Sequence, residues 1–358
     1  MVIVQTAFVG DVVFSSPLVH AVKQAQPDCH VAMMVQPDKA EVAACIPGVD
    51  EVLPFDKRHR DSGPLGLLRA AKRLRQGRFD LLISPHRSAR TALLARLSGI
   101  PTRIGYAGGM SALGFTHRIE LRANEPCRIR QDLYLLEPVG MLSESYRLRL
   151  KAPAEGRAYR DAFFNSNALS EDARLVGLCI GSVWPTKRWP AVYFASLAEF
   201  LRARNYTPVL MGGPKERSIA REIEGVLGQT LLSCVGNRLS ETAALLEHCD
   251  MVVGGDSGLT HMARALGVPT VIIFGPTDPK VHCFSEHTQV LIANVRCRPC
   301  SHHGQNRCPE RHHDCMRLVS PEQVIAALRR IADIQTPVPA RIEERQESLL
   351  GQAPATVV

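Results

Sequence analysis

The amino-acid sequence predicts an α/β fold with two doubly wound, Rossmann-like domains facing a central cleft. Short apolar runs rich in β-branched residues alternate with longer segments of helical periodicity, as in βαβ units around a parallel sheet. This alternation runs through the first half of the chain and then starts again. The length of 358 residues also suits two hydrophobic cores better than one.

The first half carries four predicted strands and four segments with helical periodicity. The strands cover residues 2–6, 31–35, 51–55 and 80–84. The helices cover residues 16–26, 65–75, 88–98 and 131–141. These elements define an N-terminal domain over residues 1–150.

The second half repeats the pattern and defines a C-terminal domain over residues 173–335. Its strands are predicted at 175–180, 208–211, 231–234, 251–253 and 270–274, and its helices at 191–204, 216–227, 240–248, 259–266 and 321–334. Residues 151–172, with Pro, Gly and polar side chains, are predicted to link the domains. Residues 336–358 have three Pro and almost no periodicity, and we expect a disordered tail.

The composition is that of a globular protein, with 45% hydrophobic and 22% charged residues. No apolar run approaches the roughly 20 residues that span a bilayer, and the N-terminus lacks a basic leader, so we expect a cytoplasmic location. The net charge is +8, and residues 54–130 carry an excess of positive charge. Such a surface attracts nucleic acid, anionic lipid or a phosphorylated glycolipid, unless it is only a set of solvated helix faces. The scarcity of aromatics in this window disfavours nucleic acid.

Ligands of open α/β sheets bind beyond the carboxyl ends of the strands, where helices begin. The first such turn contains Gly10 and Asp11 and lacks the further glycines of a dinucleotide fingerprint, which disfavours NAD. Asp11 is a candidate general base for a sugar hydroxyl. The alternative is that Asp11 only caps the following helix.

Two turns of the second half offer groups for a phosphorylated ligand. Ser182 and Lys187 follow the strand at 175–180, and the lysine is placed to bind a phosphate. The alternative is that Lys187 is a solvated surface residue without a ligand. Glu216 follows two glycines after the strand at 208–211 and is a candidate for a ribose hydroxyl, or simply a favourable acid in a first helical turn.

The most informative segment is GGDSGLTHMA, residues 254–263, which follows a strand and opens a helix. The backbone N–H groups of Ser257 and Gly258 can hold an anion, Asp256 a sugar hydroxyl, and His261 lies one helical turn further on. A second loop, FGPTDP at residues 274–279, is predicted beside it. Three such loops in one domain predict a nucleotide-diphosphate site.

The stretch DSGLTHMARALGVPTVIIFGPTDP resembles the signature of the ADP-heptose:lipopolysaccharide heptosyltransferases, glycosyltransferase family 9. The turns that contain GD, TKRWP and GGPKE match that family in the same order. The DSGLTH segment is more like that of heptosyltransferase II. The resemblance implies a GT-B fold, inversion at the anomeric carbon and no metal or other cofactor required for catalysis. It implies Asp11 as the base, Lys187 and Ser182 at the donor diphosphate and Glu216 near the ribose. Donor binding is further implied for Asp256, Ser257, Gly258 and His261.

This resemblance implies ADP-heptose as donor and the phosphorylated inner core of lipopolysaccharide, at the cytoplasmic face of the inner membrane, as acceptor. Lys57, Arg58 and Arg60 are candidates to attract that acceptor. An alternative is a GT-B enzyme that uses another nucleotide-diphosphate sugar for a surface polysaccharide. First and second heptosyltransferases share these motifs, so the sequence does not separate them.

Four of the eleven cysteines are clustered as Cys297-x2-Cys300-x7-Cys308-x6-Cys315. This spacing is typical of a structural zinc site. Two disulfides, or four reduced thiols that pack a loop, are the alternatives. The other seven cysteines, Cys127 and Cys283 among them, are predicted to be reduced and buried.

Overall fold

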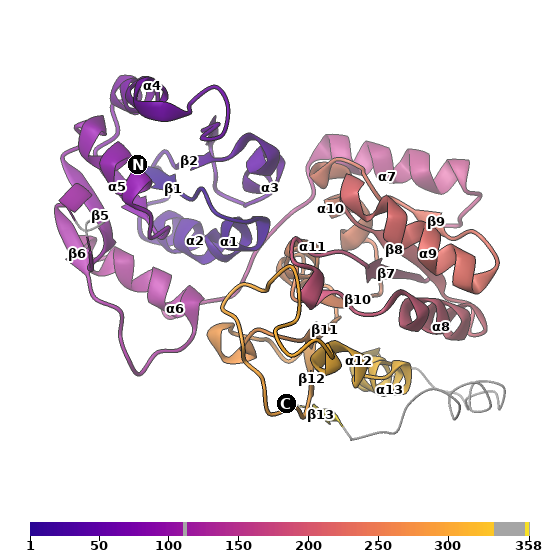
Figure 1. The fold of residues 1–358 in the computed structure, drawn as a ribbon. Helices are drawn as coiled ribbons and strands as arrows, with labels where there is room; N and C mark the ends of the chain where they lie inside the picture. The colour runs from indigo at the N-terminus through magenta and orange to yellow at the C-terminus, as the bar shows by residue number, and fades with distance from the viewer. Residues whose placement is uncertain (110–112, 333–354, 358) are drawn as a thin grey trace. The chain divides into compact units, whose positions relative to one another are not determined.

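The computed structural model describes residues 1–109, 113–332 and 355–357, which form two compact units (Figure 1). Unit 1 comprises Met1–Arg157 with the short segments Arg238–Ala243 and Lys280–Cys283. Unit 2 comprises Ala158–Asn237, Ala244–Pro279 and Phe284–Val358. Each unit is built on its own sheet.

The sheet of unit 1 is wholly parallel, with strand order β3-β2-β1-β4-β5-β6. This is the Rossmann order, in which the chain reverses direction across the sheet between β1 and β4. The strands are β1 Val2–Val4, β2 Ala32–Val35, β3 Glu51–Pro54, β4 Leu81–Ser84, β5 Thr102–Tyr106 and β6 His117–Ile119. The helices are α1 Val9–Phe14, α2 Ser16–Ala25, α3 Ala40–Ala44, α4 Gly63–Gln76, α5 Ala89–Ser98 and α6 Arg128–Leu133.

Both faces of this sheet are buried. Val2 and Val4 pack in one hydrophobic cluster with Leu67 and Leu74 of α4 and with α5. The alternate residue, Ile3, points to the opposite face and is also fully buried. Strands covered on both sides read as continuous apolar runs, which is why the sequence pattern located β1, β2 and β4 well.

The sheet of unit 2 repeats the order, as β12-β11-β10-β7-β8-β9, and adds antiparallel β13 beside β12. The strands are β7 Leu175–Cys179, β8 Thr207–Met211, β9 Leu232–Ser233, β10 Met251–Gly255, β11 Thr270–Phe274, β12 Thr288–Ala293 and β13 Ala355–Val357. The helices from the unit boundary onward are α7 Ala154–Ser166, α8 Ala191–Arg202, α9 Arg217–Leu227, α10 Leu239–Glu247, α11 Gly258–Ala265, α12 Asp314–Arg317 and α13 Pro321–Ala332.

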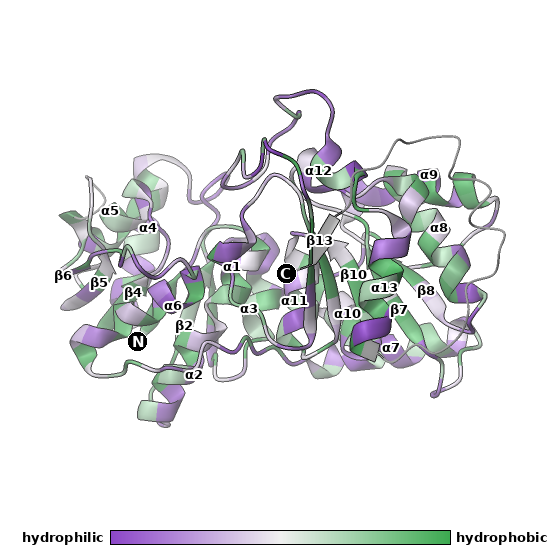
Figure 2. Cartoon of the chain, turned by 90° about the horizontal axis from the view of Figure 1, so that it is seen from below, coloured by the Kyte–Doolittle hydropathy of each residue, from purple (hydrophilic) through white to green (hydrophobic). Residues whose placement is uncertain are grey.

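The unit 2 core lies between the sheet and helices α8 and α13, and Figure 2 shows hydrophobic residues along its strands. Trp189 is fully buried there, edge-on to Phe194, and its indole N–H donates to the Val319 carbonyl at 2.8 Å. This tryptophan anchors the turn just before it, which carries Lys187. Among the described residues, no helix is long and apolar enough to cross a membrane.

The predicted α/β class is confirmed, and the differences lie in short or polar elements. β5, β6 and β12 were not expected; β5 and β6 have few apolar residues to mark them. The expected linker at 151–172 contains helix α7. The expectation of a disordered tail is wrong for Ala355–Val357, which pair with the open edge of β12 as β13; residues 336–354 and 358 lie outside the described residues.

Candidate active site

In unit 2 the candidate site lies between β7 and β10, where the chain reverses the direction in which it adds strands to the sheet. We call this point the direction change. β7 and β10 are neighbours, but the chain leaves β7 towards β8 and leaves β10 towards β11. Such a point opens a crevice beyond the strand ends, where ligands of doubly wound sheets bind. The turns that follow these two strands carry Lys187 and Asp256, so the structure brings two predicted site residues to this crevice.

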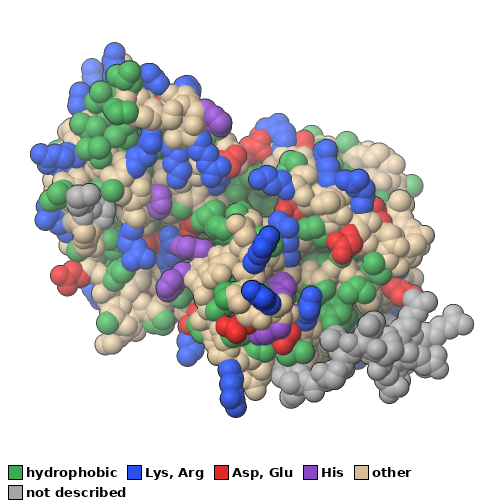
Figure 3. Space-filling model, in the orientation of Figure 1, with side chains coloured by type: hydrophobic (Ala, Val, Ile, Leu, Met, Phe, Trp, Pro, Cys, Tyr) green, Lys and Arg blue, Asp and Glu red, His purple; other side chains and the backbone are tan. Residues whose placement is uncertain are grey.

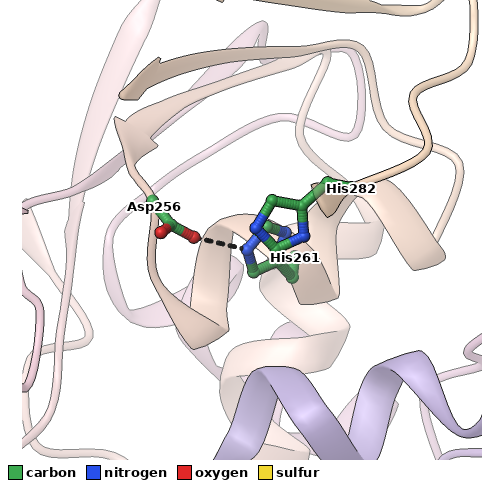
Figure 4. A group of neighbouring side chains, drawn as sticks. All are labelled: Asp256, His261 and His282. Carbon is green, nitrogen blue, oxygen red and sulfur yellow. Dashed lines mark hydrogen bonds and ion pairs between the residues drawn. The ribbon is translucent and has the colours of Figure 1, made fainter. Parts of the chain in front are cut away.

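Lys187 and Asp256 form a buried ion pair. The Lys187 Nζ lies 2.5 Å from Asp256 Oδ2, and the two side chains are 12% and 6% exposed. Thr277, in the loop after β11, donates to the same oxygen at 2.8 Å. His261 Nε2 lies 2.9 Å from the other oxygen, as Figure 4 shows. We call Lys187, Asp256, His261 and Thr277 the Asp256 cluster.

The hydrogen bonds of His261 determine which ring nitrogen carries the proton. Arg264 NH1 lies 2.9 Å from His261 Nδ1, and because a guanidinium only donates, Nδ1 must accept. Nε2 therefore carries the hydrogen that points to Asp256. Burial lowers the pKa of His261, so the ring is neutral near pH 7. Both nitrogens are engaged by protein groups, which gives His261 a supporting role for Asp256.

The two glycines before Asp256 are required by close packing. A Cβ on Gly255 would collide with the backbone carbonyl of Lys187, and a Cβ on Gly254 would collide with Thr260 Oγ1. The turn that carries Lys187 can rest directly on β10 only because position 255 has no side chain. Helix α11 begins at Gly258, three residues after Gly255, with Ser257 as its N-cap. The N–H groups of its first turn are available to an anion.

Ser182 and Glu216 meet in a second group of the same unit. Arg188 donates to the Ser182 carbonyl through Nε at 3.0 Å and NH2 at 2.7 Å, and its NH2 lies 3.4 Å from Glu216 Oε1. Glu216 Oε2 accepts the Gly213 N–H at 2.9 Å. Arg188 is thus a positioned residue, which the sequence alone did not distinguish from a solvated one.

In unit 1 the structure places Asp11 inside helix α1, not in the loop that the sequence predicted. Its Oδ2 accepts the Phe8 N–H at 2.9 Å, so Asp11 does cap the helix. Its Oδ1 also lies 2.6 Å from Arg128 NH1 of α6, and the carboxylate is 9% exposed. A carboxylate offers about four lone pairs, so these two partners leave capacity for a third.

Arg128 belongs to a buried polar network that no sequence motif revealed. Burial alone would lower its pKa, but the carboxylates of Asp11 and Asp132 raise it, so Arg128 stays a cation. Asp132 accepts the Tyr106 hydroxyl at 2.6 Å. Burial raises the pKa of Asp132 to about 6 against the effects of Arg128 and Tyr106. The network fixes the cation that holds Asp11.

His86 and Lys57 also lie at the direction change of unit 1, beside the end of β1. His86 Nδ1 is 2.9 Å from the Thr6 hydroxyl, and Lys57 Nζ donates to the Thr6 carbonyl at 2.7 Å. Burial and then the Lys57 charge lower the pKa of His86 to about 4, so its ring is neutral near pH 7.

The three predicted acceptor residues are not equivalent. The pKa of Lys57 is lowered by burial and then by the charges of Lys39, Arg58 and Arg90. This marks an excess of positive charge around Lys57 that an anion would neutralise. Arg60 instead forms an ion pair with Asp61 at 3.3 Å, which leaves it less suited to bind an anion.

The four clustered cysteines line one small cavity in unit 2, together with Thr186 and His313. None of the four is in a disulfide. The prediction that the scattered cysteines are all reduced is wrong for Cys127 and Cys283, which are joined in a disulfide although they are 156 residues apart. Sequence spacing gives no signal for such a distant pair.

Both halves of the chain thus have the Rossmann strand order, and each direction change carries charged groups suited to phosphate or sugar chemistry. These features define a protein of the GT-B class, with two nucleotide-binding-type domains. Comparisons with known proteins agree: residues 67–311 match the model of glycosyltransferase family 9 (heptosyltransferase).

The chain is 27% identical to lipooligosaccharide heptosyltransferase 2 of Haemophilus influenzae over 78% of its length and 84% of that protein. A solved family 9 glycosyl transferase from Veillonella parvula superposes with a TM-score of 0.81 at 25% identity, over 93% of this chain and 97% of that one. E. coli ADP-heptose lps heptosyltransferase II shares the fold with a TM-score of 0.74 at 22% identity, over 92% and 98%.

The chain belongs to glycosyltransferase family 9, and it is a glycosyltransferase.

Proposed function

We propose that the protein transfers heptose from ADP-heptose to the inner core of lipopolysaccharide, in the manner of heptosyltransferase II and with inversion at the anomeric carbon. The observation that carries this proposal is the buried pair of Lys187 and Asp256 at the direction change of unit 2. It stands where the family signature implies contact with the donor diphosphate. The similarity to a lipooligosaccharide heptosyltransferase 2 and to an ADP-heptose lps heptosyltransferase II supports the same donor.

Lys187 and the start of α11 stabilise the leaving group. The Lys187 ammonium lies 2.5 Å from Asp256 Oδ2. A diphosphate brings a second anion within reach of this ammonium and of the N–H groups at Ser257 and Gly258. Negative charge on ADP grows as the bond to the sugar breaks, so these groups bind the transition state more tightly than the donor.

Asp11 is the proposed general base. It takes the proton of the acceptor hydroxyl while that oxygen forms its bond to the anomeric carbon, and the bond between this carbon and the ADP oxygen breaks. One displacement of this kind inverts the anomeric configuration. Arg128 orients Asp11, since its NH1 lies 2.6 Å from one carboxylate oxygen. The reaction is a group transfer without oxidation or reduction, and we assign it no cofactor.

The acceptor is proposed to be the anionic, phosphorylated inner core. The positive charges around Lys57, including Arg58 and Arg90, favour a phosphate group there. Lys57 is the principal candidate among the predicted acceptor residues, because Arg60 already has Asp61 as its partner.

Helix α4 is proposed to hold the protein at the inner membrane, where this acceptor lies. Leu65 and Leu68 are 72% and 50% exposed. They share one helix face with Arg69 and Lys72, which are four and seven residues after Leu65. In Figure 3, hydrophobic side chains border Lys and Arg over the part of the surface where Figure 1 places α4. Apolar and basic side chains on one face suit an anionic lipid surface.

The test is incubation with ADP-heptose and defined truncated inner-core acceptors, followed by mass measurement of the product. One added heptose on an acceptor that already carries the first heptose supports the proposal. No transfer to any truncated core, together with thermal stabilisation by UDP but not by ADP, would instead favour another nucleotide sugar.

A further inference from the structure

The loop between β12 and α12 lacks the means to order itself by hydrophobic burial. It runs from Asn294 to His313, and Val295 is its single aliphatic residue apart from proline. Long segments without regular structure are usually functional loops, and small folds that lack an apolar core are often held by a cross-link or a bound ion. Three of the clustered cysteines lie in this loop, and Cys315 follows in α12.

Three of these four cysteines are not core residues, whereas Cys315 belongs to the hydrophobic core of unit 2. Cys315 is buried, but Cys297 and Cys308 are half-buried and Cys300 is exposed. A thiol that only fills space would be covered by apolar neighbours, as buried free cysteines usually are. The four thiols instead surround one cavity, and none is in a disulfide.

We propose that Cys297, Cys300, Cys308 and Cys315 bind one divalent transition metal ion, zinc or iron, as four thiolates. A tetrahedral set of four sulfur ligands selects these two metals. No three of the sulfur atoms lie within 4.8 Å of one another. Binding therefore requires them to close around the ion, and it releases the thiol protons.

This metal centre also positions the Asp256 cluster. Thr186 and Gln305 exchange two hydrogen bonds, at 2.8 and 2.9 Å, and His313 Nε2 lies 2.9 Å from the Thr186 carbonyl. Thr186 directly precedes Lys187 in the chain. The cysteine loop thus fixes the turn that carries the lysine.

The same loop holds the other side of the cluster. Arg298, between two of the proposed ligands, donates to the carbonyls of Gly275 and Thr277 at 3.0 Å each. Thr277 in turn donates to Asp256. The metal centre is therefore a positioning device for the diphosphate site, and this part of the inference rests on the proposed function.

The metal is tested on the full chain, purified under reducing conditions without added metal, with Cys300→Ser as the main variant. Cys300 is exposed, so replacing its thiol with the hydroxyl of serine leaves the packing unchanged. Cys29→Ser is the matched control, since Cys29 is a free thiol outside the cluster. His312→Ala tests a rival ligand, because its Nε2 lies 3.9 Å from Cys297 Sγ.

Elemental analysis should find about one zinc or iron per chain in the wild type, in Cys29→Ser and in His312→Ala, and at least about tenfold less in Cys300→Ser. Cobalt added to the chelator-treated wild type should give the intense visible absorption of a tetrahedral thiolate site. The exposed Cys300 should resist a thiol reagent until a chelator is added. A metal-free wild type with reactive or disulfide-bonded cluster cysteines overturns the proposal, as does unchanged metal in Cys300→Ser or metal loss in His312→Ala.

The positioning role is tested by ADP binding. Cys300→Ser should bind ADP about tenfold more weakly, the effect of one misplaced charge-assisted hydrogen bond, while Cys29→Ser matches the wild type. Metal loss with unchanged ADP affinity overturns the link to Lys187 but not the metal site. If the wild type binds metal but no ADP, the proposed function fails while the metal site stands.

Discussion

The ion pair of Lys187 and Asp256 allows the structural and functional roles of the lysine to be measured separately. The perturbations are Lys187→Met, which keeps the length of the side chain without its charge, Asp256→Asn, and the two together. The side chains are 12% and 6% exposed, so each single change leaves an uncompensated buried charge. Loss of one partner of such a pair destabilises a fold by about 3–5 kcal/mol.

We expect Lys187→Met to lower the free energy of unfolding by about 3 kcal/mol. This is the low end of that range, because Asp256 keeps Thr277 and His261 as partners. The double variant leaves no charge unpaired and should recover most of this loss. ADP affinity should behave differently. An ammonium that donates to a phosphate contributes about 1.5–3 kcal/mol, so both Lys187→Met and the double variant should bind ADP about 10- to 150-fold more weakly.

The assays are denaturant unfolding for stability and calorimetry for ADP. Asp256→Asn frees the Lys187 ammonium and should bind ADP at least as tightly as the wild type. A double variant with both wild-type stability and wild-type ADP affinity would refute a diphosphate role for Lys187. Wild-type stability in Lys187→Met alone would show that the pair is not buried as described.

Three further predictions concern unit 1. Asp11→Asn should reduce heptose transfer by about 10²- to 10⁴-fold, as for loss of a general base, and leave ADP affinity within about twofold. For His86, whose pKa is lowered to about 4, the unfolded chain takes up a proton near pH 6.5 that the folded chain resists, so stability falls as the pH drops from about 6.5 to 4. This loss is about 2 kcal/mol at pH 5, and His86→Gln should remove it in unfolding curves. Leu65→Gln with Leu68→Gln should weaken binding to anionic vesicles by at least about tenfold.

Each of these three has a distinct contradicting result. Transfer at the wild-type rate by Asp11→Asn would exclude it as the base. If the stability of His86→Gln falls between pH 6.5 and 5 as much as that of the wild type, a group other than His86 causes the fall. Leu121→Gln is the control for α4, because Leu121 is also an exposed leucine of unit 1, 46% exposed; equal vesicle binding by the α4 variant and this control would argue against α4 as the membrane contact.

The sequence predicted the fold class well because the central strands are buried on both faces. β7, β10 and β11 are fully buried runs whose residues are apolar or glycine apart from Thr270, which gives a clear signal. β5 and β6 lie towards one edge of their sheet and contain Arg103, His117 and Arg118, so their strand character depends on pairing with neighbours. Strand pairing is a tertiary property that local apolar pattern does not report.

The candidate site was predicted as separate motifs, but its connections were not. The family signature marked Lys187 and Asp256, yet their ion pair joins residues 69 positions apart. Arg128 and Asp132 lie in α6, over one hundred residues after Asp11, and no local spacing indicates that they share a network with it. Asp11 itself was expected in a loop, because Gly10 was taken as a turn and not as part of helix α1. The four clustered cysteines could be predicted to lie close together, because they are only a few residues apart in the sequence.

The bare backbone at Gly255 lets the turn that carries Lys187 rest directly on β10. A methyl group there would collide with the Lys187 carbonyl and lift this turn away from the strand. Protein engineers could therefore change how strongly the site holds a diphosphate while every charged side chain stays in place, by altering only the backbone support beneath Lys187.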